Sequence, residues 1–300
     1  MPTSSLPLRF AVCLVAAFVA GHVAGPAALH AQLSSFPDPI AELQASYETW
    51  VDHAFGPFPD QDLLRLRTTH PPNHLVLPGL PADADIDAFE WLGQDLYYFS
   101  LADWTELPGG LRVHPADIVV WNGTQYSKYF DSVACGASPG LNIDALDVNP
   151  GIFGGEVPLV SFDTNQAFPS GSGPVYLFDE ELITLNPSAC LLGGAAITIA
   201  GSERRWDLDA LAVFGRWGIL LDSLYYLSYD TWVAPSGAVG GPGDAVAYRA
   251  FGELWQSPLH GNYQGTIPTR DLDALWIHPA GIFEDGFESG NSARWSATEP

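Results

Sequence analysis

Cations are scarce in this chain of 300 residues, which carries 11 Lys and Arg against 35 Asp and Glu, a formal net charge of −24. Lys128 is its one lysine. Nucleic-acid binding depends on Lys and Arg neutralising phosphates, so nucleic acid is not an expected partner. Adsorption to an anionic membrane surface needs the same residues and is excluded for the same reason.

Catalytic motifs are also scarce. The sequence has no P-loop, no G-x-G-x-x-G segment and no HExxH pair. Residues 136–140 match G-x-S-x-G in form, but Pro139 follows Ser138, and a nucleophile elbow requires a helix there. A Gly/Ser/Pro loop explains this match.

Cysteine is nearly absent, with three in the chain. Cys13 lies in the N-terminal apolar segment, which leaves Cys135 and Cys190. Two cysteines suffice for one disulfide in an oxidising compartment, and we predict that Cys135 and Cys190 form it. The alternative is two separate buried thiols.

Long apolar runs are confined to the N-terminus, where residues 10–20 follow Arg9. A run of this length suits a signal peptide and is short for a membrane span. We therefore predict a signal peptide over 1–31 and a secreted protein, located outside the cell, at its surface or in the periplasm. An uncleaved anchor is the alternative, and no later segment is expected to span a membrane.

The rest of the chain is apolar and rich in turns, with 47% hydrophobic residues, 12% aromatics, 30 Gly and 25 Pro. This composition predicts an all-β fold. A segment Asp/Asn-Ile/Leu-Asp-Ala occurs four times, at residues 85–88, 142–145, 207–210 and 271–274. A second segment that begins with Ser occurs at 46–50, 100–104, 161–165 and 228–232. Such internal repeats predict a repeated structural unit.

Each unit of about 60 residues holds four strand-like stretches, the pattern of a propeller blade. In the third unit the last two strands are expected at 175–178 and 182–185. The N-terminal region supplies strands two to four of one unit, and the C-terminal region supplies only its first strand. We therefore predict a four-bladed β-propeller-like ring over 32–280, closed by pairing of the N- and C-terminal segments. An open β-sandwich or a stack of β-meanders is the alternative.

The repeated acidic residues are the candidate metal ligands. Residues i and i+2 of a strand point to one face, so the two acids of each copy should lie together in the channel. Carboxylates gathered in this way are stabilised by a hard cation such as calcium. Alternatively, the acids cap backbone amides where each strand begins. The candidates are Asp85, Asp87, Asp144, Asp207, Asp209, Asp271 and Asp273, and Asn142 replaces the remaining Asp.

Tryptophan recurs at one repeat position, at Trp50, Trp104 and Trp232, which predicts packing between blades. Trp91, Trp217 and Trp255 lie off that position and are candidates for a surface patch. Such a patch would bind an extracellular protein or glycan, and the chain is expected to be a monomer.

The Asp-Ala pairs, followed by aromatic strands and Trp, resemble the first half of each hemopexin-type repeat, a family of four-bladed propellers. The longer units here, and the lack of a cysteine bridge between first and last blades, differ from that family. The repeated Asp-Ile/Leu-Asp-Ala segments are similar to those of uncharacterised secreted bacterial proteins. The tail at 281–300 contains DGFESG, which resembles a C-terminal element of many secreted bacterial proteins.

Together these features predict a secreted, non-catalytic binding or structural protein, with calcium as a candidate stabilising ion. The alternative is an extracellular hydrolase or lyase that uses carboxylates at the channel mouth, which would need acids of unlike pKa. Glu90 departs from the repeat pattern and is a candidate acid for that alternative.

Overall fold

The structure is a computed structural model in which all described residues belong to one compact unit that begins at Ile40. It describes residues 40–46, 51–53, 56–58, 63–67, 70–93, 95–138, 140–150, 156–163, 167–168, 175–176, 179, 181–192, 197–198, 207–214, 224–229, 233, 245–249, 254–259 and 274–279. The expected signal peptide, the C-terminal tail, Asp271 and Asp273 lie outside these residues.

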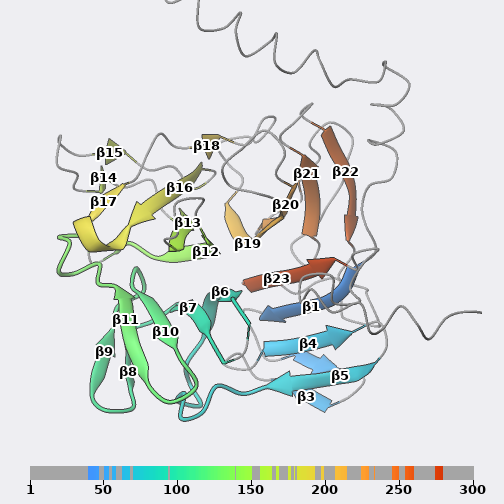
Figure 1. The fold of residues 1–300 in the computed structure, drawn as a ribbon, viewed down its shortest axis with the longest axis horizontal. Helices are drawn as coiled ribbons and strands as arrows, with labels where there is room; N and C mark the ends of the chain where they lie inside the picture. The colour runs from blue at the N-terminus through green and yellow to red at the C-terminus, as the bar shows by residue number, and fades with distance from the viewer. Residues whose placement is uncertain are drawn as a thin grey trace, which may run out of the picture. The chain divides into compact units, whose positions relative to one another are not determined.

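The described chain is all-β, as predicted, and its main elements are four antiparallel sheets (Figure 1). The first sheet has the order β23-β1-β4-β5, with strands Ala274–Pro279, Ile40–Ser46, Leu63–Arg67 and His70–Leu75. The second has the order β6-β7-β10-β11, with strands Ile86–Trp91, Tyr97–Leu101, Ile118–Trp121 and Tyr126–Phe130. Both therefore contain the four strands that the repeat predicts.

The other two sheets repeat this order. The third is β12-β13-β16-β17, with strands Ile143–Pro150, Glu156–Phe162, Glu181–Asn186 and Leu191–Leu192, and β18 (Ile197–Thr198) also pairs with β16. The fourth is β19-β20-β21-β22, with strands Leu208–Phe214, Leu224–Tyr229, Ala245–Arg249 and Leu254–Leu259. We call β23, β6, β12 and β19 the leading strands, because each begins its unit at the Asp-Ala segment.

The first sheet joins the two ends of the described chain. β1 pairs antiparallel with β23, with Ile40 opposite Pro279 and Ser46 opposite Ala274 (Figure 1). The pairing of N- and C-terminal segments that the sequence predicts is therefore present. Each leading strand also contacts leading strands of other sheets: β6 contacts β12, β12 contacts β19, β19 contacts β23, and β23 contacts β6.

Small hairpins between the second and third strands of a sheet are an addition that the repeat pattern did not predict. They are β2–β3 (Val51–His53 and Gly56–Phe58), β8–β9 (Thr105–Leu107 and Leu111–Val113) and β14–β15 (Ala167–Phe168 and Val175–Tyr176). In the third unit the prediction was therefore wrong. Residues 175–176 belong to a hairpin, 182–185 lie in the third strand, and the 3-10 helix η1 (Pro187–Ala189) leads to the fourth.

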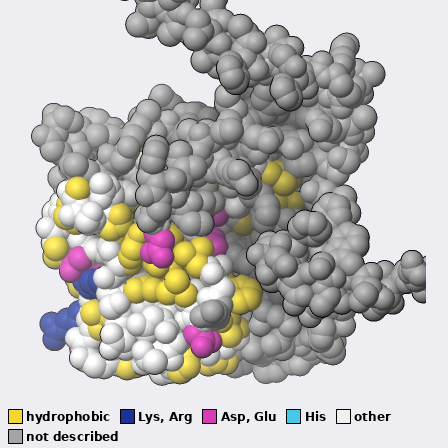
Figure 2. All heavy atoms as spheres, viewed as in Figure 1, with side chains coloured by type: hydrophobic (Ala, Val, Ile, Leu, Met, Phe, Trp, Pro, Cys, Tyr) yellow, Lys and Arg dark blue, Asp and Glu magenta, His cyan; other side chains and the backbone are white. Residues whose placement is uncertain are grey.

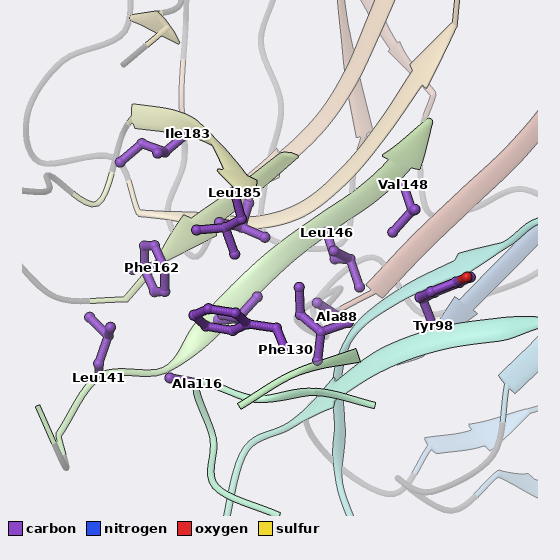
Figure 3. Packing of buried hydrophobic residues seen from close by; sticks show 13 residues of the cluster. Ala88, Tyr98, Ala116, Phe130, Leu141, Leu146, Val148, Phe162, Ile183 and Leu185 are labelled. Carbon is purple, nitrogen blue, oxygen red and sulfur yellow. The ribbon is translucent and has the colours of Figure 1, made fainter. Parts of the chain in front are cut away.

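The core consists of apolar clusters that join neighbouring sheets. One of them combines Tyr98 and Phe130 of the second sheet with Phe162 and Leu185 of the third (Figure 3). Burying an aromatic or aliphatic side chain of this size stabilises a fold by about 1.5–3 kcal/mol. Similar clusters join the first sheet to the second and the third to the fourth. Among the described residues, no helix has the length and apolar character needed to cross a membrane.

Candidate functional site

The second Asp of the repeat occupies a special backbone position. In β6, β12 and β19 the pairing register shifts at Asp87, Asp144 and Asp209, so each is the extra residue of a β-bulge. A bulge leaves its extra residue out of the regular ladder and re-aims that side chain. The backbone thus treats this Asp alike in all three leading strands where it is described.

Small residues surround each bulge. The Ala that follows the bulged Asp pairs with the Ser that begins the second repeated segment. These Ser residues, Ser100, Ser161 and Ser228, are fully buried. Ser100 Oγ donates a hydrogen bond to the carbonyl oxygen of Ile143, at 2.8 Å, which connects the second sheet to the leading strand of the third. The small Ala and Ser side chains explain how leading strands lie this close together.

Asn142 brings two carboxylates from different sheets together. Its Nδ2 donates to Oδ2 of Asp87 at 2.5 Å and to Oδ1 of Asp144 at 2.9 Å. Asn142 directly precedes β12 and Asp144 is its bulge residue, so their contact comes from the bulge and not from regular strand alternation. We call Asp87, Asn142 and Asp144 the acidic clamp.

Burial makes the acidic clamp electrostatically unfavourable. Asp144 is only 5% exposed, and neither its Oδ2 nor Oδ1 of Asn142 has a hydrogen-bond partner. Burial raises the pKa of Asp144 well above its ordinary value, and the charge of Asp87 raises it further. Burial likewise raises the pKa of Asp87 to about 7, although the Asn142 hydrogen bond acts to lower it. Both shifts disfavour the ionised carboxylates.

Other acids act on the clamp through their charge. Asp85 and Asp163 raise the pKa of Asp87, and Asp163, Asp207 and Asp209 raise that of Asp144. Five of the seven acidic candidates lie outside the clamp. The charges of three of them, Asp85, Asp207 and Asp209, act on the clamp, whereas Asp271 and Asp273 are not described. Asp163 was missed, although an acid also stands two residues after Ser at Glu48 and Asp230.

Oxygen atoms of the acidic clamp are the donors a hard cation would use. Asp87 and Asp144 offer carboxylate oxygens, and Asn142 offers an amide oxygen, which are typical ligands of calcium. Within the described part of the chain, no group of three or more His, Cys, Asp and Glu has a metal-binding arrangement. The clamp contains two carboxylates, so a full ligand set would need further oxygens.

A buried Ser–His–Asp set lies in the connections before β10 and after β11, where its hydrogen bonds hold these two loops together. Oδ1 of Asp117 accepts hydrogen bonds from the backbone amide and the hydroxyl of Ser132, both at 2.7 Å. Oδ2 of Asp117 accepts from the amide of His114 at 2.8 Å and pairs with Nζ of Lys128 at 2.7 Å. Because the Ser hydroxyl donates to the carboxylate and is fully buried, it is not placed as a nucleophile.

The loop that Asp117 holds also carries a disulfide. Cys135 and Cys190 are bonded, with Cα atoms 5.1 Å apart and a sequence separation of 55. This bond joins the connection after β11 to the residue that follows η1. It ties the second sheet to the third at a point away from the leading strands.

Of the aromatic predictions, the one for Trp104 was wrong. Its side chain is 60% exposed, whereas packing between blades would bury it. The small inserted hairpin β8–β9 begins directly after Trp104, and this carries the indole away from the interface between sheets. Trp91 is partly buried, stacked on Tyr97, and the other Trp side chains singled out above lie outside the described ones.

Two open grooves lie apart from the acidic clamp. One of about 630 Å³ is beside η1, and its lining includes Tyr129, Glu156 and Asn186. The other, of about 800 Å³, lies beside β8–β9 and includes Pro108 and Trp121. Neither groove is lined by Asp87 or Asp144.

No protein-family model matches the chain, and no curated protein matches it. A protein of unknown function from Bacteroides caccae aligns at 9% identity over 79% of this chain and 98% of its own, with a TM-score of 0.33. A protein described as the extracellular domain of a one-component system from B. thetaiotaomicron aligns at 9% identity over 81% of this chain, with a TM-score of 0.32. The chain spans 38% of that second protein's length. Similarities this weak carry no argument about fold or function.

Proposed function

We propose that this chain is a secreted, non-catalytic binding or structural protein whose leading strands hold a calcium-type cation. One observation carries the proposal: Asn142 brings the carboxylates of Asp87 and Asp144 together where Oδ2 of Asp144 and Oδ1 of Asn142 are buried without hydrogen-bond partners. Buried oxygens without partners cost free energy, and a cation that binds them removes that cost.

The capping alternative has less support at these two positions. A capping Asp accepts a hydrogen bond from a backbone amide. Among the described contacts, Asp87 and Asp144 accept from the Asn142 side chain. Two ionised carboxylates bridged by one amide still repel each other, so they require protons or a cation.

The scaffold in this proposal is a four-bladed propeller-like ring. Its support is the cycle of contacts among β6, β12, β19 and β23, together with the pairing of β1 and β23. Closing a ring removes exposed strand edges, which otherwise invite aggregation. The likeness to hemopexin-type repeats is architectural in this proposal and brings no ligand with it.

Export is supported by the disulfide. Disulfides persist in compartments outside the cytosol, because thiols are not kept reduced there. The Cys135–Cys190 bond therefore fits the signal peptide expected over 1–31. A partner protein or glycan would then be extracellular.

The hydrolase alternative has less support, because acid–base catalysis requires carboxylates that reach a substrate. Asp144 is almost fully buried, and the open grooves are lined by other residues. Glu90 is also buried, at 6% exposed. The acidic positions therefore favour a structural role.

Thermal unfolding in calcium and in chelator tests the cation. We expect calcium to raise the melting temperature and chelator to lower it, since a ligand of the folded state stabilises that state. Asp144→Asn keeps the size of the side chain but removes its charge, so it should weaken calcium binding in a calorimetric titration. The same substitution should raise the melting temperature in chelator at alkaline pH, because the amide needs no proton to stay neutral where it is buried.

Asp83→Asn is the matched control. Asp83 is exposed and lies two residues before Asp85, so its substitution changes the net charge equally but leaves the clamp intact. The rise in melting temperature on adding calcium should be the same for Asp83→Asn as for the native chain. A native melting curve that is identical in calcium and chelator would refute the cation.

A further inference from the structure

Trp104 is a large apolar side chain left in solvent. It is 60% exposed, and only Val76 and Val133 share this exposure among the large apolar side chains of the described part. An exposed indole forgoes the stabilisation of burial and is available for contact with another molecule. Its position directly before β8–β9 places it at the base of the inserted hairpin.

The indole is held in a defined orientation. Its ring meets the ring of His114 edge to face, with centroids 4.5 Å apart and planes at 90°. His114 is 1% exposed, and its Nδ1 accepts a hydrogen bond from the amide of Ala116 at 3.2 Å. Because the His114 ring that contacts it is buried and hydrogen-bonded, the Trp104 side chain loses little conformational freedom when a partner binds.

An exposed acidic residue, Asp103, directly precedes this indole in sequence. Asp103, exposed and adjacent in sequence, is close enough to Asp87 for its charge to raise the pKa of that carboxyl. Two cations of the same unit already pair with other acids. Lys128 pairs with Asp117 and Asp131, and Arg112 lies 3.7 Å from Glu106. In the described part of the chain, no cation pairs with Asp103.

We propose that Trp104 and Asp103 form a recognition site for a cationic side chain, Arg or Lys, of an extracellular partner protein. A cation over the indole face is attracted to the ring, and the Asp103 carboxylate adds a charge of opposite sign. The net charge of −24 attracts a basic partner from a distance. Among the side chains coloured in Figure 2, acidic ones (magenta) appear at several places and basic ones (dark blue) lie at the left edge.

Binding of a short arginine-rich peptide to the full chain tests this site. The probe is acetylated tetra-arginine amide, and its control is the same peptide with citrulline, which keeps the shape of Arg without its charge. Tryptophan fluorescence and calorimetry should show arginine-specific binding that weakens at high salt. Trp104→Ala should reduce the affinity about tenfold, and Asp103→Asn about threefold.

Further variants separate recognition from misfolding. Trp104→Phe keeps an aromatic face and should retain part of the affinity. Val133→Ala removes an exposed apolar side chain on a different loop and should leave the affinity unchanged. The titration is repeated in chelator, where binding should persist, so that a failure of the cation site and a failure of this site are distinguishable.

Three results would overturn the proposal. The native chain does not bind the peptide, Trp104→Ala binds it as tightly as the native chain does, or the citrulline peptide binds equally well. A neutral oligosaccharide that binds at Trp104 regardless of Asp103 would indicate a glycan site and would also overturn it.

Discussion

At the scale of single residues, Asn142 is the informative departure from the repeat. Three copies carry Asp at its position, and Asn142 instead supplies an amide that donates to two carboxylates. An Asp at position 142 would place a third negative charge beside the buried carboxyls of Asp87 and Asp144. The amide of Asn142 therefore avoids this repulsion, and it makes the segment at 142–145 unlike the other three copies.

The acidic clamp predicts a pH dependence of stability. The folded state raises the pKa of Asp87 to about 7 and that of Asp144 well above its ordinary value. Between the ordinary Asp pKa and these raised values the folded state holds more protons than the unfolded state, so stability falls as pH rises. In chelator, the melting temperature should therefore fall between about pH 4 and pH 7.

Two comparisons check this prediction. The double variant Asp87→Asn/Asp144→Asn should show a smaller fall over the same pH range, whereas Asp83→Asn should follow the native chain. Saturating calcium should flatten the native curve, because the cation replaces the protons. An equally steep fall in the double variant would assign the dependence to other groups.

The hydrogen bonds of Asp117 predict a large stability effect outside the acidic clamp. Asp117→Ala leaves the buried amides of His114 and Ser132 without their acceptor, and Lys128 without its closest partner. The expected loss is roughly 3 kcal/mol in the free energy of unfolding, measured by denaturant titration. Asp131→Ala removes the more exposed partner of the same lysine and should cost about 1 kcal/mol or less. Equal losses of stability in Asp117→Ala and Asp131→Ala would contradict the interpretation that Asp117 holds the loops together.

At the scale of elements, the disulfide compensates for a short strand. β17 has two residues, Leu191 and Leu192, so its own ladder holds the edge of the third sheet weakly. Cys190 precedes it directly and is bonded to the loop of the neighbouring sheet. The bond therefore fixes η1 and β17 where few backbone hydrogen bonds do.

Reduction tests that role. A reductant should lower the free energy of unfolding by about 3 kcal/mol, because the bond closes a long loop. The variant Cys135→Ser/Cys190→Ser should show the same loss without reductant and no further loss with it. If the reductant leaves the native chain unchanged, the two cysteines are separate thiols.

The sequence predicted the strands of three units well, because apolar and aromatic stretches alternate there with turn residues. It failed in the third unit, where Val175 and Tyr176 have strand composition yet belong to an inserted hairpin. Composition alone does not say which partner a short strand takes. The bulges at Asp87, Asp144 and Asp209 were likewise unpredicted. Apolar residues follow one another directly after each of these Asp residues, so there is no strict alternation for an extra residue to interrupt.

The sequence predicted only part of the candidate site, because it does not show which sheets come into contact. Repetition singled out Asp87 and Asp144, but the bridge from Asn142 depends on the contact between β6 and β12. The exposure of Trp104 was predicted incorrectly, because a recurring Trp is typical of packing. Contacts between sheets decide both features, and no single unit contains them.

At the scale of the whole molecule, the pairing of β1 with β23 predicts that a separate peptide can replace β23 when that strand is deleted. A chain ending at residue 269 lacks β23 and leaves the backbone of β1 unpaired on one edge. Its melting temperature should be lower than that of the full chain. A synthetic peptide of residues 270–280 should bind to it and restore stability, whereas the same peptide with Leu275→Pro, which lacks an amide, should not.

The outcome distinguishes a closed arrangement from an open one. If β23 completes the first sheet and contacts β19 and β6, its loss should affect three sheets and broaden the whole transition. A truncated chain that melts like the full chain would show that β23 contributes nothing to the fold.

The register of β1 and β23 also bears on circular permutation. Ile40 lies opposite Pro279, so the two strands form a hairpin that lacks only its turn. A short covalent turn between them would make the first sheet a continuous four-stranded meander, and new termini could then be cut between β5 and β6. Such a permutant would carry four whole repeats in tandem, the arrangement that duplication of a single ancestral sheet would produce.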